Sequence, residues 1–480
     1  MDSTHRTDTI VAIATPPGRG GIGVVRLSGP EARRIAESLL KLRRPLEAGR
    51  ARFALIVDRN ADGAVLDEAM ATYFAAPHSY TSEDVVEIAA HGSPVVLEFL
   101  VRQSIAAGAR LAEPGEFTER AFLSGRLDLT QAEAVRDLIE ASTLNQARVA
   151  ARQLGGALSR SVAPIKERLV ALIAGLEAGV DFAEDDIDTM PMEEITARIA
   201  AVEAPLLELE RGFKYGRIVH DGLRLAIVGR PNAGKSSLFN RLVERDRAIV
   251  TATPGTTRDL VTERVAIEGI PVELIDTAGL REASDEAETI GIAKSREAMA
   301  DADLVLLVVD TSTEAHAEDT ATLAGVEGRP VLVALNKVDL GEAAGLGLEV
   351  EKRVSPLRPA ASGRNDDVEG KRLTNAVQVV RTSAVTAEGI AELRKAIVEL
   401  AGAGTSEQET ALVTNLRQRQ SITSALGALM KAKAATDAGV PHEMLLLDLY
   451  EALAALDGLT GATTAEDILR LIFSSFCIGK

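Results

Sequence analysis

Apolar and polar residues alternate differently in successive stretches of the chain, and the changes divide it into four parts. The first part, residues 1–120, mixes short apolar segments typical of strands with longer segments of helical period. The predicted strands cover residues 10–14, 23–27, 69–74 and 85–90, and the predicted helices cover residues 31–40 and 94–107. We therefore expect an α/β or α+β domain in this part.

The second part, residues 121–218, has helical periodicity, many Ala and Leu residues and few chain breakers. Residues 219–402 alternate between strand and helix patterns, and residues 403–480 are helical again, with a last amphipathic helix predicted at 467–477. Because two helical stretches flank the third part, we expect it to be an insertion into one helical domain. Residues 341–374, which carry Gly, Pro and many charges, are expected to form a mobile surface insertion.

The composition is that of a globular protein, with 46% hydrophobic and 26% charged residues. The net charge of −18, from 71 acids and 53 bases, disfavours broad binding to nucleic-acid phosphates, so an RNA contact would need a local basic patch or a partner. The single cysteine, Cys477, excludes an internal disulfide and suits a reducing compartment. No apolar run approaches the ~20 residues that cross a bilayer, and the first ten residues contain no apolar signal segment. These features predict a cytoplasmic protein, and the scattered histidines show no metal-ligand spacing.

One strand-to-helix turn in the third part has the pattern of a phosphate-binding loop. An apolar segment at 223–228 precedes Gly229-Arg-Pro-Asn-Ala-Gly-Lys-Ser236, and a predicted helix at 237–243 follows it. Glycines let the backbone N–H groups and the helix N-terminus surround phosphates, Lys235 can reach the β- and γ-phosphates, and the Ser236 hydroxyl can hold Mg²⁺. Taken alone, the same pattern also fits an ordinary glycine-bearing turn.

Four further motifs follow in a fixed order: Thr256-Thr257, Asp276-Thr-Ala-Gly279, Asn336-Lys-Val-Asp339 and Ser383-Ala384. The last three end apolar segments at 272–275, 331–335 and 377–380. Thr257 can complete a Mg²⁺ shell only while a γ-phosphate is present, Asp276 can bind Mg²⁺ through water, and Asp339 can accept two hydrogen bonds from guanine. The ordered set predicts binding of GTP rather than ATP. The predicted GTP-binding residues are Asn232, Ala233, Gly234, Lys235, Ser236, Ser237, Thr256, Thr257, Asp276, Thr277, Ala278, Gly279, Asn336, Lys337, Asp339, Ser383 and Ala384.

Two catalytic parts found in many GTPases are missing from these motifs. Leu280 stands where a glutamine often orients the attacking water, and the sequence identifies no arginine finger. The acidic stretch containing Glu282, Asp285, Glu286 and Glu288 could position the water, or it could simply be the solvated start of a helix.

The ends of the chain carry more specific motifs. The first part contains Ala14-Thr-Pro-Pro-Gly-Arg-Gly-Gly-Ile-Gly23 and Pro114-Gly-Glu-Phe-Thr118, residues 122–134 follow, and the sequence ends in Phe473-Ser-Ser-Phe-Cys-Ile-Gly-Lys480. Together they closely resemble the tRNA-modification GTPase family MnmE (TrmE) over essentially the whole chain. The resemblance implies an α+β folate-binding N-terminal domain at 1–120, a discontinuous helical domain at 121–218 and 403–480, and an inserted Ras-like P-loop GTPase domain at 219–402. The GTPase domain would have a central, mostly parallel sheet.

The resemblance also implies a homodimer, formed through the N-terminal domains. With an FAD-dependent partner, MnmG (GidA), the family adds an aminomethyl or carboxymethylaminomethyl group to C5 of the wobble uridine in certain tRNAs. The implied one-carbon donor is 5,10-methylene-tetrahydrofolate, with 5-formyl-tetrahydrofolate as a bound analogue.

Individual residues match functional positions of the family. Arg26, Glu87, Arg126 and Lys480 match folate-contacting positions, although the family usually has lysine where Arg126 stands. A surface salt bridge for Arg126 and a disordered tail for Lys480 are the alternatives. Cys477 matches a cysteine important for modification, and a small buried apolar residue is an equally good interpretation.

The same resemblance supplies the missing catalytic parts. Asn232 matches a potassium-ligating asparagine, and the backbone of residues 251–256 would wrap the ion. Potassium would take the role of the arginine finger and would bring two GTPase domains together. Glu288 matches the family's water-orienting glutamate. The implied K⁺ ligands are Asn232, Thr251, Thr253 and Thr256, with Thr251 also near GTP, and the Mg²⁺ ligands are Ser236 and Thr257.

We therefore expect a potassium-dependent GTPase that drives folate-dependent uridine modification. Two alternatives stay open from the sequence. One is a regulatory GTPase of ribosome assembly without modification chemistry, and the other is a folate-dependent transferase that uses GTP only as a structural ligand.

Overall fold

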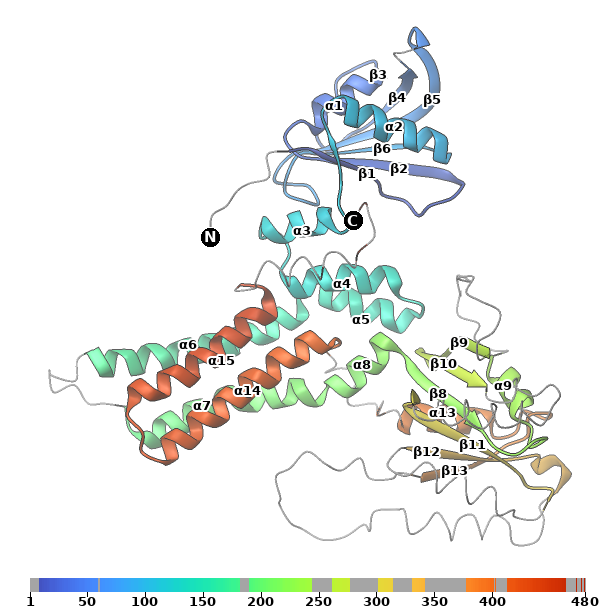
Figure 1. Cartoon of the computed structure of the whole chain (residues 1–480), viewed down its shortest axis with the longest axis vertical. Helices are drawn as coiled ribbons and strands as arrows, with labels where there is room; N and C mark the ends of the chain where they lie inside the picture. Colours follow the sequence, from blue (N-terminus) through green and yellow to red (C-terminus); the bar gives the residue numbers. More distant parts are fainter. Residues whose placement is uncertain are drawn as a thin grey trace, which may run out of the picture. The chain divides into compact units, whose positions relative to one another are not determined.

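The computed structural model describes two compact units. It covers residues 8–58, 61–181, 190–243, 261–276, 301–313, 330–341, 377–400, 402, 412–462, 472, 476 and 479. The first unit contains residues 1–136, 154–163 and 453–480, and the second contains residues 137–153 and 164–452 (Figure 1). The predicted helix at 467–477 and the predicted insertion at 341–374 lie outside the described residues, apart from 341, 472 and 476.

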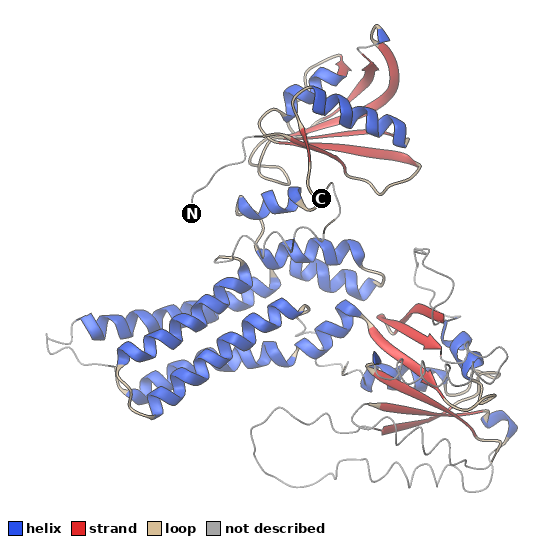
Figure 2. Ribbon diagram, in the orientation of Figure 1, coloured by secondary structure: helices blue, strands red, loops and turns tan. Residues whose placement is uncertain are grey.

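The first unit is built on a seven-stranded sheet with the strand order β3-β4-β5-β6-β2-β1-β7. Neighbouring strands are antiparallel, except that β1 and β7 are parallel. Helices α1 (Ala32–Leu39) and α2 (Pro94–Ala106) pack together on this sheet through a shared apolar core (Figure 2). The strands are β1 Ile10–Ile13, β2 Gly20–Ser28, β3 Leu40–Leu42, β4 Ala51–Asp58, β5 Ala64–Phe74, β6 Val85–Gly92 and β7 Arg110–Leu111.

All four strands and both helices predicted for this part are confirmed, with β2 and β5 beginning earlier than expected. Strands β3, β4 and β7 were not predicted. In β4 the consecutive apolar residues 54–57 hide the alternation of the strand, while β3 and β7 are only three and two residues long. The predicted helix at 31–40 ends at Leu39, because Leu40 begins β3 and pairs with Ile56.

The predicted helical stretches are confirmed over their described residues. In the second unit, α7 and α14 pack against each other although the second sheet separates them in sequence. Buried Ile195, Ile199 and Val202 form the apolar stripe of α7. The helices of these stretches, which are divided between the two units, are α3 Glu116–Leu123, α4 Leu129–Glu140, α5 Leu144–Leu154, α6 Ala157–Asp181, α7 Met192–Arg211, α8 Phe213–Asp221, α14 Leu416–Asp437 and α15 His442–Thr460.

The second unit also contains a six-stranded sheet with the order β13-β12-β11-β8-β10-β9. Every neighbouring pair is parallel except β9 with β10, so the prediction of a mostly parallel sheet is confirmed. The helices α9 (Lys235–Val243) and α13 (Ile390–Leu400) share an apolar core with this sheet. The strands are β8 Leu223–Val228, β9 Val261–Ile267, β10 Ile270–Asp276, β11 Leu304–Asp310, β12 Val331–Asn336 and β13 Val377–Arg381.

The register of this sheet aligns the carboxyl ends of its parallel strands. Asp276 of β10 lies opposite Ile227 of β8, and Asp310 of β11 lies opposite Asn336 of β12. In open α/β sheets this edge is where ligands bind, because the loops that follow parallel strands meet there. The predicted nucleotide motifs after β8, β12 and β13 therefore converge on one edge.

Candidate functional site

The loop between β8 and α9 has the backbone of a phosphate cradle. Gly229 has a φ of 143°, and a Cβ at this position would lie 2.3 Å from the Val308 carbonyl oxygen, so only glycine fits. The Lys235 Nζ atom donates hydrogen bonds to the backbone oxygens of Gly229 and Arg230, each at 2.8 Å. Its buried ammonium group is thus held inside the loop, where an entering phosphate would meet it.

Asn336 joins this loop to the loop that follows β13. Its Nδ2 atom donates to the Ala233 carbonyl oxygen at 2.9 Å, and its Oδ1 atom accepts from the Ala384 amide at 3.2 Å. Gly234 lies against the same side chain, because a Cβ at Gly234 would be 2.2 Å from Asn336 Nδ2. Asn336 is 1% exposed, so losing these partners would leave a buried amide unsatisfied.

Lys337 and Asp310 form an ion pair beside this junction, with Nζ and Oδ2 2.6 Å apart. Burial opposes the ionisation of Asp310, but hydrogen bonds from Lys337 and Ser312 hold its pKa below the ordinary value. Asp310 was not predicted as a site residue. Its position at the end of the buried run Leu304–Asp310 is the same signal that identified Asp276 and Asn336, so it could have been found.

The described residues include twelve of the predicted GTP-binding positions: Asn232, Ala233, Gly234, Lys235, Ser236, Ser237, Asp276, Asn336, Lys337, Asp339, Ser383 and Ala384. Asp276, whose side chain is not described, and Asn336 end β10 and β12, and the other ten lie in the segments that follow β8, β12 and β13 at the carboxyl edge of the sheet. Outside the described residues lie Thr251, Thr253, Thr256, Thr257, Thr277, Ala278, Gly279, Glu288, Cys477 and Lys480.

A second cluster, in the first unit, contains three of the four residues matched to folate contacts. Arg26 of β2 lies directly opposite Glu87 of β6. The Arg26 Nε and Nη2 atoms contact Glu87 Oε1 at 2.9 and 2.7 Å. Two donors of Arg26 thus share one oxygen of Glu87, and this charged pair orients both side chains on one face of the sheet.

Tyr80 lies between Arg26 and Arg126. Each guanidinium carbon is 5.5 Å from the centroid of the Tyr80 ring, within the range of cation–π contacts. The Tyr80 hydroxyl forms a 2.9 Å hydrogen bond with the Thr118 hydroxyl, and Arg126 donates to the Ser79 carbonyl oxygen. Burial raises the pKa of Tyr80, which stays a neutral phenol. Nothing in the sequence marked Tyr80, because its partners lie far from it along the chain.

Residue 479, which immediately precedes Lys480, lies beside this cluster. The Gly479 carbonyl oxygen accepts a 3.5 Å hydrogen bond from Arg26 Nη1. Gly479 has a φ of 99°, and a Cβ there would lie 2.2 Å from the Ile13 carbonyl oxygen at the end of β1. Only glycine fits this close approach, which gives a physical reason for the glycine in the terminal motif.

An ion network beside α3 is centred on two buried side chains, Glu116 and Arg120. The fully buried Glu116 carboxylate accepts hydrogen bonds from Arg110 at 2.6 Å and from Arg120 at 2.9 Å. Burial opposes ionisation, but these bonds and the Glu113 amide lower the pKa of Glu116 to about 2. Arg120, also buried, contacts Asp8 as well.

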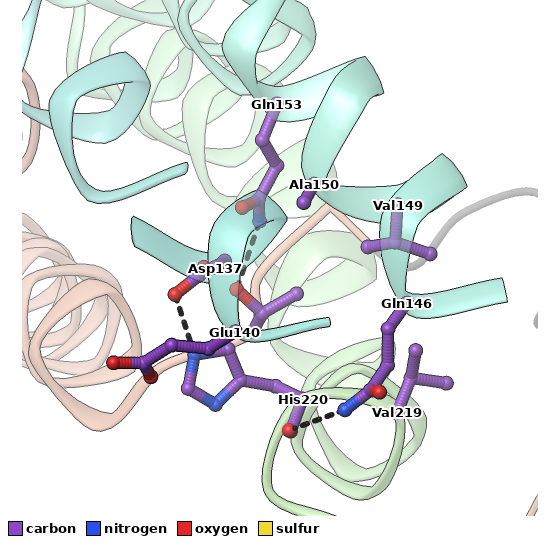
Figure 3. A pocket seen from close by; sticks show the side chains of 9 residues that line it. Asp137, Glu140, Gln146, Val149, Ala150, Gln153, Val219 and His220 are labelled. Carbon is purple, nitrogen blue, oxygen red and sulfur yellow. Dashed lines mark hydrogen bonds and ion pairs between the residues drawn. The ribbon is translucent and has the colours of Figure 1, made fainter. Parts of the chain in front are cut away.

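A small pocket in the second unit lies among α4, α5, α8 and Thr414 (Figure 3). His220 lies between two carboxylates: its Nε2 is 2.9 Å from Asp137 Oδ1, and its Nδ1 is 2.6 Å from Asp221 Oδ1. The hydrogen bonds with Asp137 and then with Asp221 raise the pKa of His220 to about 10, so the ring is an imidazolium at neutral pH.

Two glutamines of α5 hold the chain segments on either side of the second sheet. Gln146 Nε2 donates to the His220 carbonyl oxygen at 3.0 Å, just before β8. Gln153 Nε2 donates to the Leu412 carbonyl oxygen at 2.7 Å and to Thr414 Oγ1 at 2.9 Å. One helix therefore fixes both the segment that leads into β8 and the segment that precedes α14.

The described residues contain no group of three or more His, Cys, Asp or Glu side chains arranged to hold a metal ion. Within the same residues, no helix combines the length and apolarity needed to span a membrane.

Comparisons with known proteins assign the chain to a family. A model of the MnmE helical domain matches residues 129–477, and a model of the GTP-binding protein TrmE N-terminus matches residues 9–126. A tRNA modification GTPase MnmE of Koribacter versatilis is 58% identical over 98% of this chain and 99% of its own length. One of Symbiobacterium thermophilum is 43% identical with the same coverage.

A solved structure, the G domain of the Thermotoga maritima iron transporter FeoB, is 29% identical over 37% of this chain and 98% of its own length, with a TM-score of 0.26. The two family models and the full-length relatives agree with the phosphate cradle and the terminal motifs. This chain belongs to the MnmE family of tRNA modification GTPases.

Proposed function

We propose that this chain is a potassium-dependent GTPase that acts with an FAD-dependent MnmG (GidA) partner on tRNA. Together they would add a carboxymethylaminomethyl or aminomethyl group, in a folate-dependent reaction, to C5 of the wobble uridine of certain tRNAs. The observation that carries the GTPase part is the Asn336 side chain. It connects the phosphate cradle at Ala233 to the proposed guanine loop at Ala384. Curated relatives of this chain are named tRNA modification GTPases, which supports tRNA as the substrate.

The nucleotide would lie along the carboxyl edge of the second sheet. Lys235 would bind the β- and γ-phosphates, Asp339 would accept hydrogen bonds from guanine, and Ser236 with Thr257 would hold Mg²⁺. The metal would neutralise charge on the phosphates. The cradle fits the phosphates, because two backbone carbonyl oxygens already hold the Lys235 ammonium inside it.

Potassium and the catalytic water are proposed from residues matched to the family. Asn232 begins the tight part of the cradle with a φ of 61°, and its side chain would contribute to K⁺ binding. The other proposed ligands, Thr251, Thr253 and Thr256, and the proposed water-orienting Glu288 lie outside the described residues. Hydrolysis should be much faster in KCl than in NaCl, and equal rates in the two salts would contradict this proposal. Glu288→Ala should preserve GTP binding and lower turnover.

The cluster of Arg26, Glu87, Tyr80 and Arg126 is the proposed folate site. Its chemistry fits a reduced folate, because Glu87 can accept from amino and ring N–H groups while the guanidiniums suit the glutamate carboxylates. The Tyr80 ring provides a flat neutral surface. Lys480 would add a cation next to Gly479. Cys477, which lies outside the described residues, is proposed to take part in the modification.

The folate proposal can be tested by calorimetric titration with 5-formyl-tetrahydrofolate. Arg26→Gln should weaken binding about 10- to 100-fold, which corresponds to the loss of charged hydrogen bonds of about 1.5–3 kcal/mol. Arg33→Gln is a matched control, because Arg33 lies 5.3 Å from the Tyr73 ring in the same unit but outside the cluster. Equal losses in the two variants would count against the site.

A homodimer is proposed to form through the first unit. Exposed apolar side chains gather on β4 and β5, where Phe53 lies directly opposite Met70. Val65 and Leu66 extend this exposed apolar surface, which is unusual for the surface of a soluble monomer. Phe53→Glu should shift the protein towards monomers in analytical ultracentrifugation, whereas Val95→Glu on α2 should leave the association unchanged.

The modification itself is tested by mass analysis of wobble uridines in a deletion strain complemented with this chain. Restored aminomethyl or carboxymethylaminomethyl uridine that depends on MnmG would support the proposal. If the uridines were unchanged in the deletion strain while ribosome assembly failed, the alternative role as a ribosome-assembly GTPase would replace it.

A further inference from the structure

We infer that Arg241 is a positioning residue for guanine recognition, acting through the loop of residues 383–389. This inference rests on the proposed guanine contact of Ser383-Ala384. It extends that proposal by assigning the control of the loop to a residue of the phosphate-binding helix α9.

The geometry of Arg241 is that of a two-pronged clamp. It lies in the last turn of α9 (Lys235–Val243). Its Nε atom donates to the Ala384 carbonyl oxygen at 3.0 Å, and its Nη2 atom donates to the Val385 carbonyl oxygen, also at 3.0 Å. Two donors in a rigid plane match two consecutive carbonyl groups, an arrangement that a lysine ammonium cannot reproduce.

The loop of residues 383–389 is held in shape by hydrogen bonds within it, independently of α9. The Ser383 amide donates to the Glu388 carbonyl oxygen at 3.0 Å, and the Ser383 carbonyl oxygen accepts from the Ala387 amide at 2.9 Å. A Cβ at Gly389 would lie 1.7 Å from the Arg381 carbonyl oxygen, so the loop closes through a glycine. Ser383 thus sets the internal shape of the loop, but these bonds do not fix its position over the sheet.

Two side chains fix that position. Asn336 accepts the Ala384 amide from below, and Arg241 binds the carbonyl oxygens of Ala384 and Val385. Ala384 is nearly buried, while Val385 is 75% exposed and has little packing to hold it. Within the exposed half, the Thr386 amide donates to Ser383 Oγ at 3.1 Å, and Arg241 adds a restraint from outside the loop at Val385.

The consequence concerns the two ends of the nucleotide. Lys235 begins α9 in the phosphate cradle, and Arg241 in its last turn contacts the loop of residues 383–389. One rigid helix therefore sets the distance between the cradle and the proposed contact with the guanine 6-oxygen. Removing Arg241 should leave the phosphate contacts intact and weaken only the contact at the 6-oxygen. The effect should therefore depend on the chemistry of the base.

The experiment measures the affinity of the full chain for three nucleotides by fluorescence competition. They are GDP, inosine diphosphate, which keeps the 6-oxygen but lacks the 2-amino group, and 6-thioguanosine diphosphate, in which a weaker sulfur acceptor replaces that oxygen. Arg241→Ala should lower the affinity for GDP and for inosine diphosphate by about tenfold each, or about 1.4 kcal/mol. Its affinity for the 6-thio analogue should fall by a factor at least three times smaller, because the contact with atom 6 of the base is already weak in that analogue.

The controls separate positioning from loss of structure. Arg241→Lys should behave like the alanine variant for GDP, because a single ammonium cannot bind both carbonyl oxygens. Lys395→Ala on the exposed face of α13 should change none of the three affinities. If Arg241→Ala fails to fold, the three affinities are measured on Arg241→Lys instead, and its thermal melting curve shows whether that variant is folded.

The outcomes separate the role inferred for Arg241 from the proposed guanine contact of Ser383-Ala384. If the unchanged chain binds GDP and the 6-thio analogue equally well, the loop does not read the 6-oxygen, and the proposed guanine contact is wrong. If the unchanged chain discriminates between them but Arg241→Ala loses equal affinity for all three nucleotides, Arg241 is merely structural and the inference is overturned. No loss for any nucleotide would overturn it as well.

Discussion

Replacing His220 with glutamine should loosen α8 in a pH-dependent manner. His220 is held by Asp137 and Asp221, and Gly222 immediately after them leads into β8. Glutamine keeps one hydrogen-bonding group but carries no charge. The Asp137 carboxylate, whose side chain is 14% exposed, would lose its imidazolium partner. Its other oxygen, Oδ2, is buried with no hydrogen-bond partner, so the loss would not be compensated locally.

The magnitude follows from the two pKa values of His220. The pKa rises from 6.5 in the unfolded chain to about 10 in the folded protein, and each unit is worth about 1.4 kcal/mol, which sets an upper limit of about 5 kcal/mol. The Asp221 side chain is 55% exposed, so solvent screens its share. We expect a loss of about 2–3 kcal/mol, mostly from the bond with Asp137.

The direction of the pH effect follows from the raised pKa. A group whose pKa is higher in the folded state stabilises the fold fully below its unfolded pKa, and the stabilisation disappears as the pH rises through the folded pKa. For His220 the window runs from about pH 6.5 to about pH 10. The unchanged protein should therefore lose local stability across this window, while His220→Gln should show no such decline.

Hydrogen exchange detected by mass spectrometry can measure this locally, on peptides that cover α8, after correction for the intrinsic pH dependence of exchange. A local probe is needed because a chain with two units does not unfold in one step. Asp221→Asn, at the exposed side of the imidazole, should cost about 0.5 kcal/mol. The reasoning fails if the protection of α8 in the unchanged protein is flat between pH 6.5 and 10, or if Asp221→Asn costs as much as Asp137→Asn.

The remaining predictions concern buried groups and close approaches. Glu116→Gln should destabilise the first unit by about 3 kcal/mol at neutral pH in thermal unfolding, because buried Arg120 and partly exposed Arg110 both lose this carboxylate and keep only more exposed acidic partners. That difference should shrink as the pH falls from 4.5 towards 2, since the lowered pKa of Glu116 stabilises the fold only while the carboxyl is ionised. Gly479→Ala should weaken binding of 5-formyl-tetrahydrofolate without changing GTP hydrolysis, because a Cβ would meet the Ile13 carbonyl oxygen at 2.2 Å. Gly234→Ala should abolish binding of fluorescent GDP, since the new Cβ would lie 2.2 Å from Asn336 Nδ2 and would push that side chain away. Retained affinity would show that the loop can rearrange to accept the Cβ.

The nucleotide edge could be predicted from the sequence because its signals are local. Each strand of a parallel sheet is a buried apolar run, and the functional residue follows its carboxyl end directly. The sequence pattern therefore located the cradle after β8 and the motifs after β12 and β13, and the same pattern was available for Asp310 of β11. Arg241 could not be recognised this way, because an arginine in the last turn of a helix is common and its carbonyl partners lie more than 140 residues away.

The first unit was harder to predict for a related reason. Its antiparallel strands pair across long loops, so the register that places Arg26 opposite Glu87 is not visible in either segment alone. Tyr80 gains its role only through that register and through Arg126, which follows α3. The family resemblance named three residues of the cluster but not the aromatic ring between two of them.

The proposed folate cluster, unlike the nucleotide edge, depends on a residue far away in the sequence, Gly479. The nucleotide loops described here come from residues 229–389 and meet within one sheet. The proposed folate cluster combines β2 and β6 with residue 479, which packs at the end of β1. Any change that displaces the segment around residue 479 therefore removes the Gly479 carbonyl oxygen from Arg26 and leaves the Arg26–Glu87 pair unaltered on the sheet. The sheet can thus fold with its charged pair in place while the site stays incomplete, so folate affinity and the stability of the first unit should respond separately to changes at this end of the sequence.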